Sequence, residues 1–163
     1  MIADRMQGFE ASGIRKVFDL AQEIKNPVNL SIGQPDFDIP EEVKKEAVKA
    51  IEQGFNRYTI TKGMPELCEK ILGKARNENG IKAEDIMITS GVAGALTLAF
   101  LVLINPGDEV LVPDPYFVSF KHLVNLCGGK IKFVDTYPDF EITPERISPH
   151  ISPRTKILII NSP

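Results

Sequence analysis

The sequence contains no tryptophan and only two cysteines among its 163 residues. Cys68 and Cys127 lie far apart and outside any CxxC or Cys/His spacing, which argues against both a disulfide framework and a zinc site. We therefore predict no metal site. Two unpaired thiols are typical of a protein kept in a reducing compartment, so a cytoplasmic location is expected.

Long hydrophobic runs and an excess of one charge are also missing. The longest apolar stretch, residues 93–104, is too short to span a membrane and contains Thr97, and residues 1–5 lack the apolar core of a secretion signal. The 19 basic and 22 acidic residues are interspersed and give a net charge of -3. This charge pattern predicts no binding to nucleic acid or to an anionic membrane. The expected partner is a small molecule or another protein.

The first half of the chain shows helical spacing of its apolar residues. Residues 12–24 are expected to form an amphipathic helix behind a possible N-cap at Ser12, while residues 1–11 show no such period and form a leading arm. Two further amphipathic helices are predicted, one opened by Pro40 and one opened by Pro65, because proline is favoured in the first turn of a helix.

From residue 81 onward, short apolar runs alternate with helical segments. Near-continuous runs of Ile, Val and Leu between helices predict a mostly parallel sheet with helices on both faces, which is a three-layer α/β/α fold. The stretch 93–104 reads as a buried helix of that fold. The predicted strands are residues 86–88, 109–112, 131–134 and 157–160, and the predicted helices between them are residues 92–104, 117–127 and 144–147.

The chain ends at Pro163, directly after the last apolar run. Either the natural sequence continues, because an uncovered sheet would leave apolar faces and an open edge, or residues 157–160 form an edge strand covered by the helices already present. The spacing alone leaves both readings open.

The loop Thr89–Leu96 has the features of an anion site. A strand ends there in hydroxyl residues and a glycine, and a helix begins at once, so that its first backbone N–H groups point toward the carboxyl edge of the sheet. In the alternative reading, Ser90 caps a core helix and the small residues allow close packing. No GxGxxG and no P-loop lysine is present, so nothing specific supports ATP or a dinucleotide. Asp114 could imitate the ribose-binding acid of a Rossmann domain, but its flanking prolines argue against that.

Two further loops carry residues of interest. The segment Pro113–Phe120 places aromatic rings where a planar ligand could stack, although Phe117 and Phe120 could equally be core positions of the next helix. The segment Tyr58–Leu67 offers a phenol and an ammonium, or is a solvated connector. No Ser-His-Asp, HExxH or paired-carboxylate pattern is present, so no catalytic residue is assigned.

In their order along the chain, these loops resemble the amino-terminal half of the class I/II aminotransferases, which are pyridoxal-phosphate enzymes of fold type I. The resemblance covers residues 12–163. It implies an N-terminal arm and small-domain helix over residues 1–32 and an incomplete cofactor-binding large domain over residues 33–163. The motifs that carry it are Gly33-Gln34-Pro35-Asp36-Phe37, the segments 58–67, 89–96 and 105–117, and Ile160-Asn161-Ser162-Pro163.

The resemblance also implies a role for individual residues at the cofactor. The backbone N–H groups of Gly91, Val92 and Ala93 would hold the phosphate of pyridoxal 5'-phosphate. Phe117 matches the aromatic residue that stacks on the pyridine ring, a position often taken by tryptophan in the family. Tyr58 matches the tyrosine that reaches across a homodimer to the phosphate of the partner's cofactor.

Two more positions are implied to lie near the substrate. The backbone of Gly33 would lie beside the substrate carboxylate, and Ile14 would form an apolar lid. The arm, residues 1–11, would embrace the neighbouring subunit. The lysine that forms the internal aldimine, and the other catalytic residues of the family, belong to its second half and have no counterpart here.

The implied function is amino-group transfer from an amino acid to a 2-oxo acid, in amino acid metabolism, by an enzyme of which this chain is an amino-terminal fragment. The fragment alone is predicted to be inactive because the covalent lysine is absent. One alternative is a fragment of another fold-type I enzyme, such as a lyase or decarboxylase. A second alternative is a non-catalytic relative that binds proteins.

Overall fold

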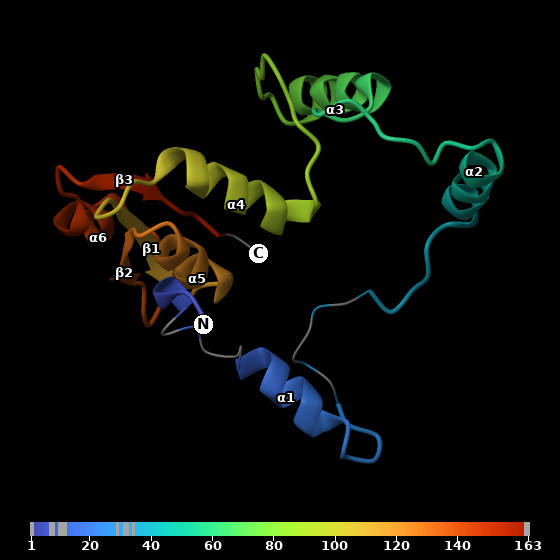
Figure 1. Ribbon diagram of the computed structural model, residues 1–163. Coiled ribbons are helices and arrows are strands. Elements are labelled where there is room, and N and C mark those ends of the chain that lie inside the picture. The colour runs from blue at the N-terminus through green and yellow to red at the C-terminus, as the bar shows by residue number, and fades with distance from the viewer. Residues whose placement is uncertain are drawn as a thin grey trace. The chain divides into compact units, whose positions relative to one another are not determined.

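The fold was obtained as a computed structural model, which describes residues 2–6, 9, 13–28, 30, 33 and 35–161. The chain divides into two compact units. One unit combines Met1–Pro27 with Gly91–Pro163, and the other is Val28–Ser90. Figure 1 shows the helices and strands of both units in chain order.

The first unit contains a parallel sheet of three strands in the order β2-β1-β3. The strands are β1 (Glu109–Asp114), β2 (Lys130–Asp135) and β3 (Thr155–Leu158). Val110 pairs with Ile131 on one side and with Ile157 on the other. The pairing continues past β3, where the backbone N–H of Ile159 donates to the carbonyl oxygen of Leu111 over 2.9 Å. The predicted α/β class with parallel strands is therefore confirmed.

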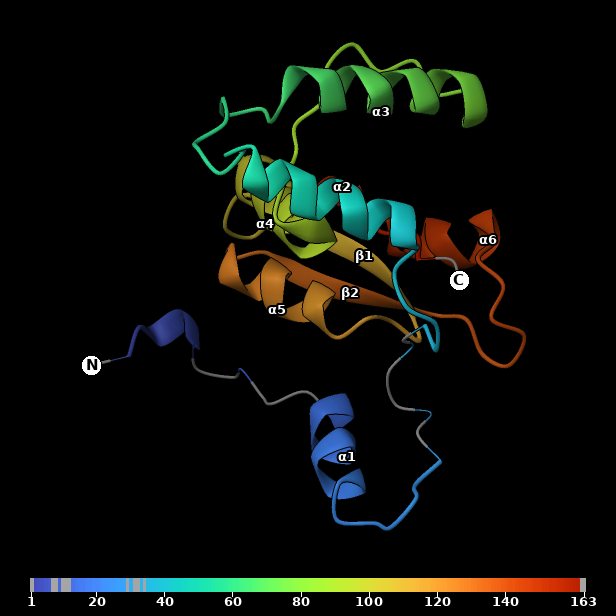
Figure 2. The same cartoon turned by 90° about the vertical axis from the view of Figure 1, so that its right-hand side faces the viewer.

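Two helices cover one face of this sheet. They are α4 (Gly91–Leu103) and α5 (Ser119–Leu126), and Figure 2 shows α5 alongside β2. Apolar side chains from both helices meet the alternate residues of β1 that point to this face, as expected for a period of two. The buried core consists of Phe100, Ile104, Val110, Val112, Phe120 and Val124.

A shorter segment covers the opposite face of the sheet. It comprises α6 (Pro144–Ile147) and the 3-10 turn Ser148–His150. The ammonium of Lys132 in β2 donates to the carbonyl oxygen of His150 over 3.5 Å, which places this turn on the face opposite Val110. Leu111, on the same face, is completely buried. The first unit therefore has the helix–sheet–helix layering that the sequence predicts.

The expectation that residues 93–104 form a wholly buried helix is wrong in one respect. Within α4 only Phe100 is buried, whereas Leu101 and Val102 are exposed. A helix has one side that can lie on a sheet, and the apolar residues of α4 run around its whole circumference. Its outward side consequently remains apolar and uncovered in this structure.

The predicted strand at residues 86–88 is not formed. The N–H of Ile86 donates to the side chain of Asp85, and the N–H of Ile88 donates to the carbonyl oxygen of Lys62 over 2.8 Å. A strand needs a neighbour along its length, and within the described residues this run pairs with none. The apolar composition was therefore insufficient to predict a strand here.

The helices of the second unit follow the sequence closely. They are α2 (Glu41–Glu52), which has Pro40 at its N-cap position without a side-chain cap hydrogen bond, and α3 (Pro65–Glu78), which has proline in its first turn. In the first unit, α1 is Gly13–Ala21, so the predicted helix ends three residues before Ile24. Ser12, its proposed N-cap, lies outside the described residues. The domain boundary between residues 32 and 33 stays a prediction.

A buried carboxylate joins the amino ends of the three strands. Glu109, at the start of β1, is only 3% exposed. It accepts hydrogen bonds from the Lys132 ammonium at 2.8 Å, the Ser152 hydroxyl at 2.5 Å and Nε of Arg154 at 3.3 Å. The contact with Lys132, followed by that with Ser152, lowers the pKa of Glu109 from 4.5 to about 2. Glu109 therefore favours folding in its charged form.

We expect this carboxylate to make folding sensitive to acid. Because its pKa is lower in the folded chain, its contribution is present above pH 4.5 and disappears as the pH falls toward 2. The urea midpoint of the native chain should thus fall more steeply between pH 4.5 and 2 than that of Glu109→Gln. Glu84→Gln, at an exposed position, is the control and should follow the native curve. Parallel curves for the native chain and Glu109→Gln would contradict the assignment.

Candidate functional site

A pocket of about 450 Å³ lies in the first unit, where β1 and β3 end. In parallel sheets this carboxyl edge is the usual place for ligands, because the loops and helix N-termini converge there. The lining comes from the first half of α4, the loop after β1, α5, and the segment after β3. The lining residues are Val92, Ala93, Leu96, Phe117, Ser119, Phe120, Leu123, Ile159, Ile160 and Asn161.

The first turn of α4 gives this pocket a positively polarised end. Gly91 begins the helix with a φ of +67°, a backbone conformation that glycine adopts without the strain that a Cβ would cause. Val92 and Ala93 follow directly and line the pocket. The helix dipole adds positive potential at the first turn of a helix. The arrangement can therefore bind an anionic group.

Phe117 and Phe120 have different surroundings. Phe120 is 5% exposed and belongs to the core, whereas Phe117 is 49% exposed. Their rings meet edge to face, with centroids 5.8 Å apart and an interplanar angle of 78°. Phe120 thus supports Phe117 from the core side, and the ring of Phe117 contributes to the wall of the pocket. A planar ligand could stack on that ring.

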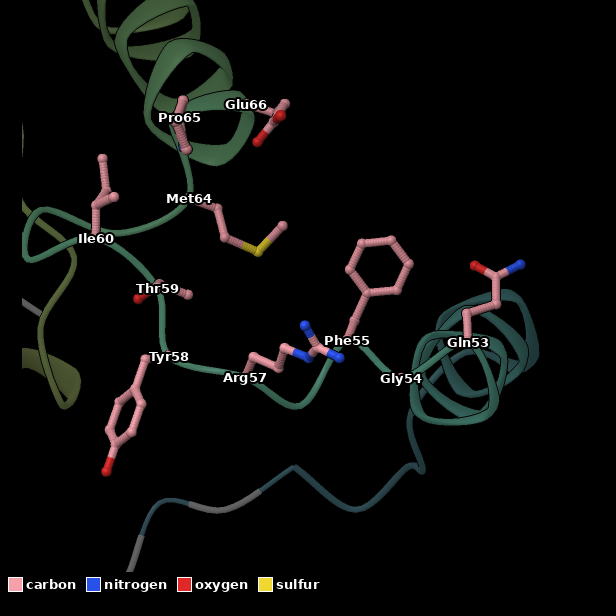
Figure 3. Close-up of a pocket in the computed structure, with 10 residues that line it drawn as sticks. All are labelled: Gln53, Gly54, Phe55, Arg57, Tyr58, Thr59, Ile60, Met64, Pro65 and Glu66. Atoms are coloured by element: carbon pink, nitrogen blue, oxygen red, sulfur yellow. The ribbon is translucent and has the colours of Figure 1, made fainter.

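The remaining predicted site residues lie elsewhere. Tyr58 belongs to the second unit, where its side chain is fully exposed beside a pocket of about 470 Å³ between the end of α2 and the start of α3. In Figure 3, Phe55 and Met64 point into that space, while the ring of Tyr58 points away from them. Gly33 is exposed in the same unit, and Ile14 lies half-exposed on α1. The roles assigned to these three residues stay predictions.

The structure brings together Val92, Ala93 and Phe117, with Gly91 immediately before them in α4. No site role was predicted for Ser119 and Asn161, the two polar side chains of the pocket lining. A signal for both was available, since each follows shortly after a strand at the carboxyl edge of the sheet. Ser119 opens α5, and Asn161 ends the described part of the segment after β3.

The chemistry that this pocket can perform is limited. Among its ten lining residues there is no Lys, His, Asp, Glu, Tyr or Cys, so the lining offers no side chain suited to proton transfer. In the part of the chain that the structure describes, no three His, Cys, Asp or Glu side chains gather as metal ligands. None of the described helices has the length and hydropathy of a membrane span. The pocket can bind and orient a ligand.

The backbone at Gly91 leads to a prediction about folding. Gly91→Ala should destabilise the chain by about 1–2 kcal/mol, the usual strain of a left-handed conformation in a residue with a Cβ. Gly73→Ala is the matched control, because Gly73 lies inside α3 with nothing within 4 Å of an added Cβ. It should stabilise by about 0.5–1 kcal/mol, the ordinary helix advantage of alanine. Urea unfolding measures both; a neutral or stabilising Gly91→Ala would show that this helix start does not need glycine.

The chain is similar in sequence to a known protein family. The sequence model of the family described as "Aminotransferase class I and II" matches residues 25–163. The probable aspartate aminotransferase of Methanocaldococcus jannaschii is 38% identical over 165 residues, which span 100% of this chain and 44% of that protein. The aspartate/prephenate aminotransferase of Thermus thermophilus is 41% identical over 152 residues, covering 91% of this chain and 40% of its own length.

Solved structures show the same similarity. The aspartate aminotransferase from Thermus thermophilus with maleate matches with a TM-score of 0.94 and 39% identity, over 100% of this chain and 45% of that one. The aspartate aminotransferase from Rhizobium meliloti matches with a TM-score of 0.91 and 36% identity, over 100% of this chain and 43% of its own. The chain therefore spans less than half the length of these relatives.

Proposed function

The chain belongs to the class I and II aminotransferase family, and we propose that it is the phosphate-binding part of an enzyme that moves an amino group from an amino acid to a 2-oxo acid with pyridoxal phosphate. The observation that carries the proposal is the pocket in which the start of α4 and the ring of Phe117 lie together. An anion-binding helix terminus beside an aromatic wall matches the two ends of this cofactor, a phosphate and a planar ring.

The residues present fit the cofactor. A Cβ placed on Gly91 would meet nothing within 4 Å, so the space beside the start of α4 is open to a phosphate. The remaining walls are apolar apart from Ser119 and Asn161. Ligand pockets of about this size are commonly apolar with a few polar groups that fix orientation. The composition of the pocket therefore suits a ring held by stacking and an anion held by amides.

Each part of the chain has a distinct task in this proposal. The amides of Gly91, Val92 and Ala93 hold the phosphate, and Phe117 sets the plane of the ring. The side chains of Leu96, Phe120, Leu123 and Ile159 keep water from the inner wall. When bound, the cofactor supplies an electron sink for bonds to the α-carbon of the amino acid. The proton transfers of the reaction need groups that this lining does not contain.

We extend the proposal to the residues outside the pocket. Gly33 would present its backbone to the substrate carboxylate, and Ile14 would cover the substrate with an apolar side chain. Tyr58 would act in a homodimer, at the phosphate of the partner's cofactor, which suits its fully exposed side chain. Both cysteines are unpaired, which supports the cytoplasmic location inferred for the enzyme.

The phosphate site is tested by placing a negative charge in it. Val92→Asp should lower the affinity of the chain for pyridoxal phosphate about tenfold or more. The added carboxylate and the phosphate are both negative, and like charges near a protein surface repel by several kcal/mol. A loss of about 1.4 kcal/mol in binding free energy already corresponds to a tenfold loss of affinity. Val92→Asn has nearly the same shape without the charge and should bind as the native chain does. Equilibrium dialysis measures the affinities, with inorganic phosphate as competitor. Equal affinities for Val92→Asp and Val92→Asn would refute the phosphate site.

A second prediction concerns activity. The 163-residue chain, incubated with pyridoxal phosphate, aspartate and 2-oxoglutarate, should form no glutamate above the rate of the free cofactor. The physical reason is that its pocket lining contains neither an amine to hold the cofactor nor a side chain to move the α-proton. Amino acid analysis of the mixture measures the product. Glutamate formation that depends on the chain would show that another of its residues supplies these groups.

A further inference from the structure

An aromatic stack joins the beginning of the chain to α5. The ring of Phe9 lies on the imidazole of His122, with centroids 4.7 Å apart and an interplanar angle of 20°. The N–H of Phe9 donates to the carbonyl oxygen of Met6 over 3.3 Å, which ties Phe9 to the 3-10 turn Asp4–Met6. That turn itself contacts α5, and Figure 1 shows it (blue) beside this helix.

His122 occupies the outward side of α5. The helix buries Phe120 and Val124 against the sheet, and His122 lies midway between them in sequence, about 200° around the helix from each. Its Nδ1 is nevertheless buried, and no described residue forms a hydrogen bond with it. A buried imidazole nitrogen without a partner loses its hydration and gains nothing polar in return. The contact with Phe9 is therefore an apolar, aromatic contact.

Helix α5, on which Phe9 packs, also forms a wall of the cofactor pocket. Ser119, Phe120 and Leu123 all line the pocket, and Phe120 supports Phe117 edge to face. The sheet holds α5 from the inside, and Phe9 covers it from the outside. A shift of α5 would move these three lining residues. It would also change the contact of Phe120 with Phe117. The position of this helix therefore bears on the geometry of the pocket.

We propose that Phe9 and His122 form a clip within one chain that holds α5 in the position the cofactor pocket requires. Both are positioning residues, since neither lines the pocket. The proposal rests on the function proposed above for that pocket. It assigns the beginning of the chain to its own α5, whereas the family resemblance implies an arm that embraces the neighbouring subunit.

The absence of tryptophan makes the clip directly measurable. In Phe9→Trp the indole is the only one in the 163-residue chain, and its ring can stack on His122 as phenylalanine does. Its emission should be blue-shifted relative to tryptophan in water and protected from acrylamide quenching. Adding His122→Ala should abolish this protection. Adding His122→Phe should retain it, because an aromatic face remains and Nδ1 of His122 has no hydrogen bond to a described residue that could be lost. Solvent-exposed emission in all three variants would overturn the clip.

A mixing experiment distinguishes a contact within one chain from a contact between chains. The double variant Phe9→Trp/His122→Ala is co-expressed with differently tagged native chain, and species carrying both tags are isolated. If the clip is internal, the indole stays exposed in the mixed species, since its own chain lacks His122. Renewed protection would show that Phe9 contacts the partner's helix and would overturn the proposal. If no mixed species forms, protection in Phe9→Trp alone comes from its own chain and supports the clip.

The effect on the pocket is tested by binding. Phe9→Ala should lower the affinity for pyridoxal phosphate several-fold, and Phe9→Tyr, which keeps the stack, should restore it. Ile2→Ala, which removes an exposed side chain from the same segment, should bind as the native chain does. Unchanged affinity in Phe9→Ala would overturn the positioning role. If the native chain itself binds no pyridoxal phosphate, the proposed function fails, while protection of the indole still reports whether the clip exists.

Discussion

The structure of the first unit depends on the burial of β1 between two parallel neighbours. Val110, Leu111 and Val112 are almost completely inaccessible, and they bury side chains on both faces of the sheet. Because parallel strands are joined by crossovers, α5 connects β1 to β2 and returns along the face on which α4 also lies. The start of α4 and the loop before α5 are thereby brought to the same edge of the sheet. The pocket is a consequence of that arrangement.

The lining of the pocket is suited to binding a ligand and not to transferring protons. Its polar features are a helix terminus and two uncharged side chains, and its aromatic ring is held by a buried neighbour. In the proposed function, these features would bind and orient a ligand with a phosphate and a planar ring. No lining side chain is suited to transfer a proton. The chain spans less than half the length of the relatives that it matches.

Local signals predicted most of the helices and the three strands that formed. Proline marked the beginning of both α2 and α3: it lies in the first turn of α3, where it is favoured, and directly before the first turn of α2. The run at residues 86–88 looked like a strand, but pairing depends on a distant neighbour that composition does not reveal. The ion-pair and hydrogen-bond cluster around Glu109 could not be predicted from local sequence either, since the partners of Glu109 lie 23 to 45 residues away along the chain. Phe117 and Phe120 could be told apart only by their burial.

The proposed function requires the first turn of α4 to bind phosphate, and NMR of its backbone amides measures this binding. Titration of the chain with inorganic phosphate should shift the N–H resonances of Gly91, Val92 and Ala93 first and saturably, with pyridoxal phosphate shifting the same resonances at lower concentration. Because phosphate binding at a helix terminus acts through backbone amides, these groups report it without any mutation. Shifts confined to amides near surface lysines, with the three α4 resonances unmoved at saturation, would show that this helix terminus does not bind phosphate.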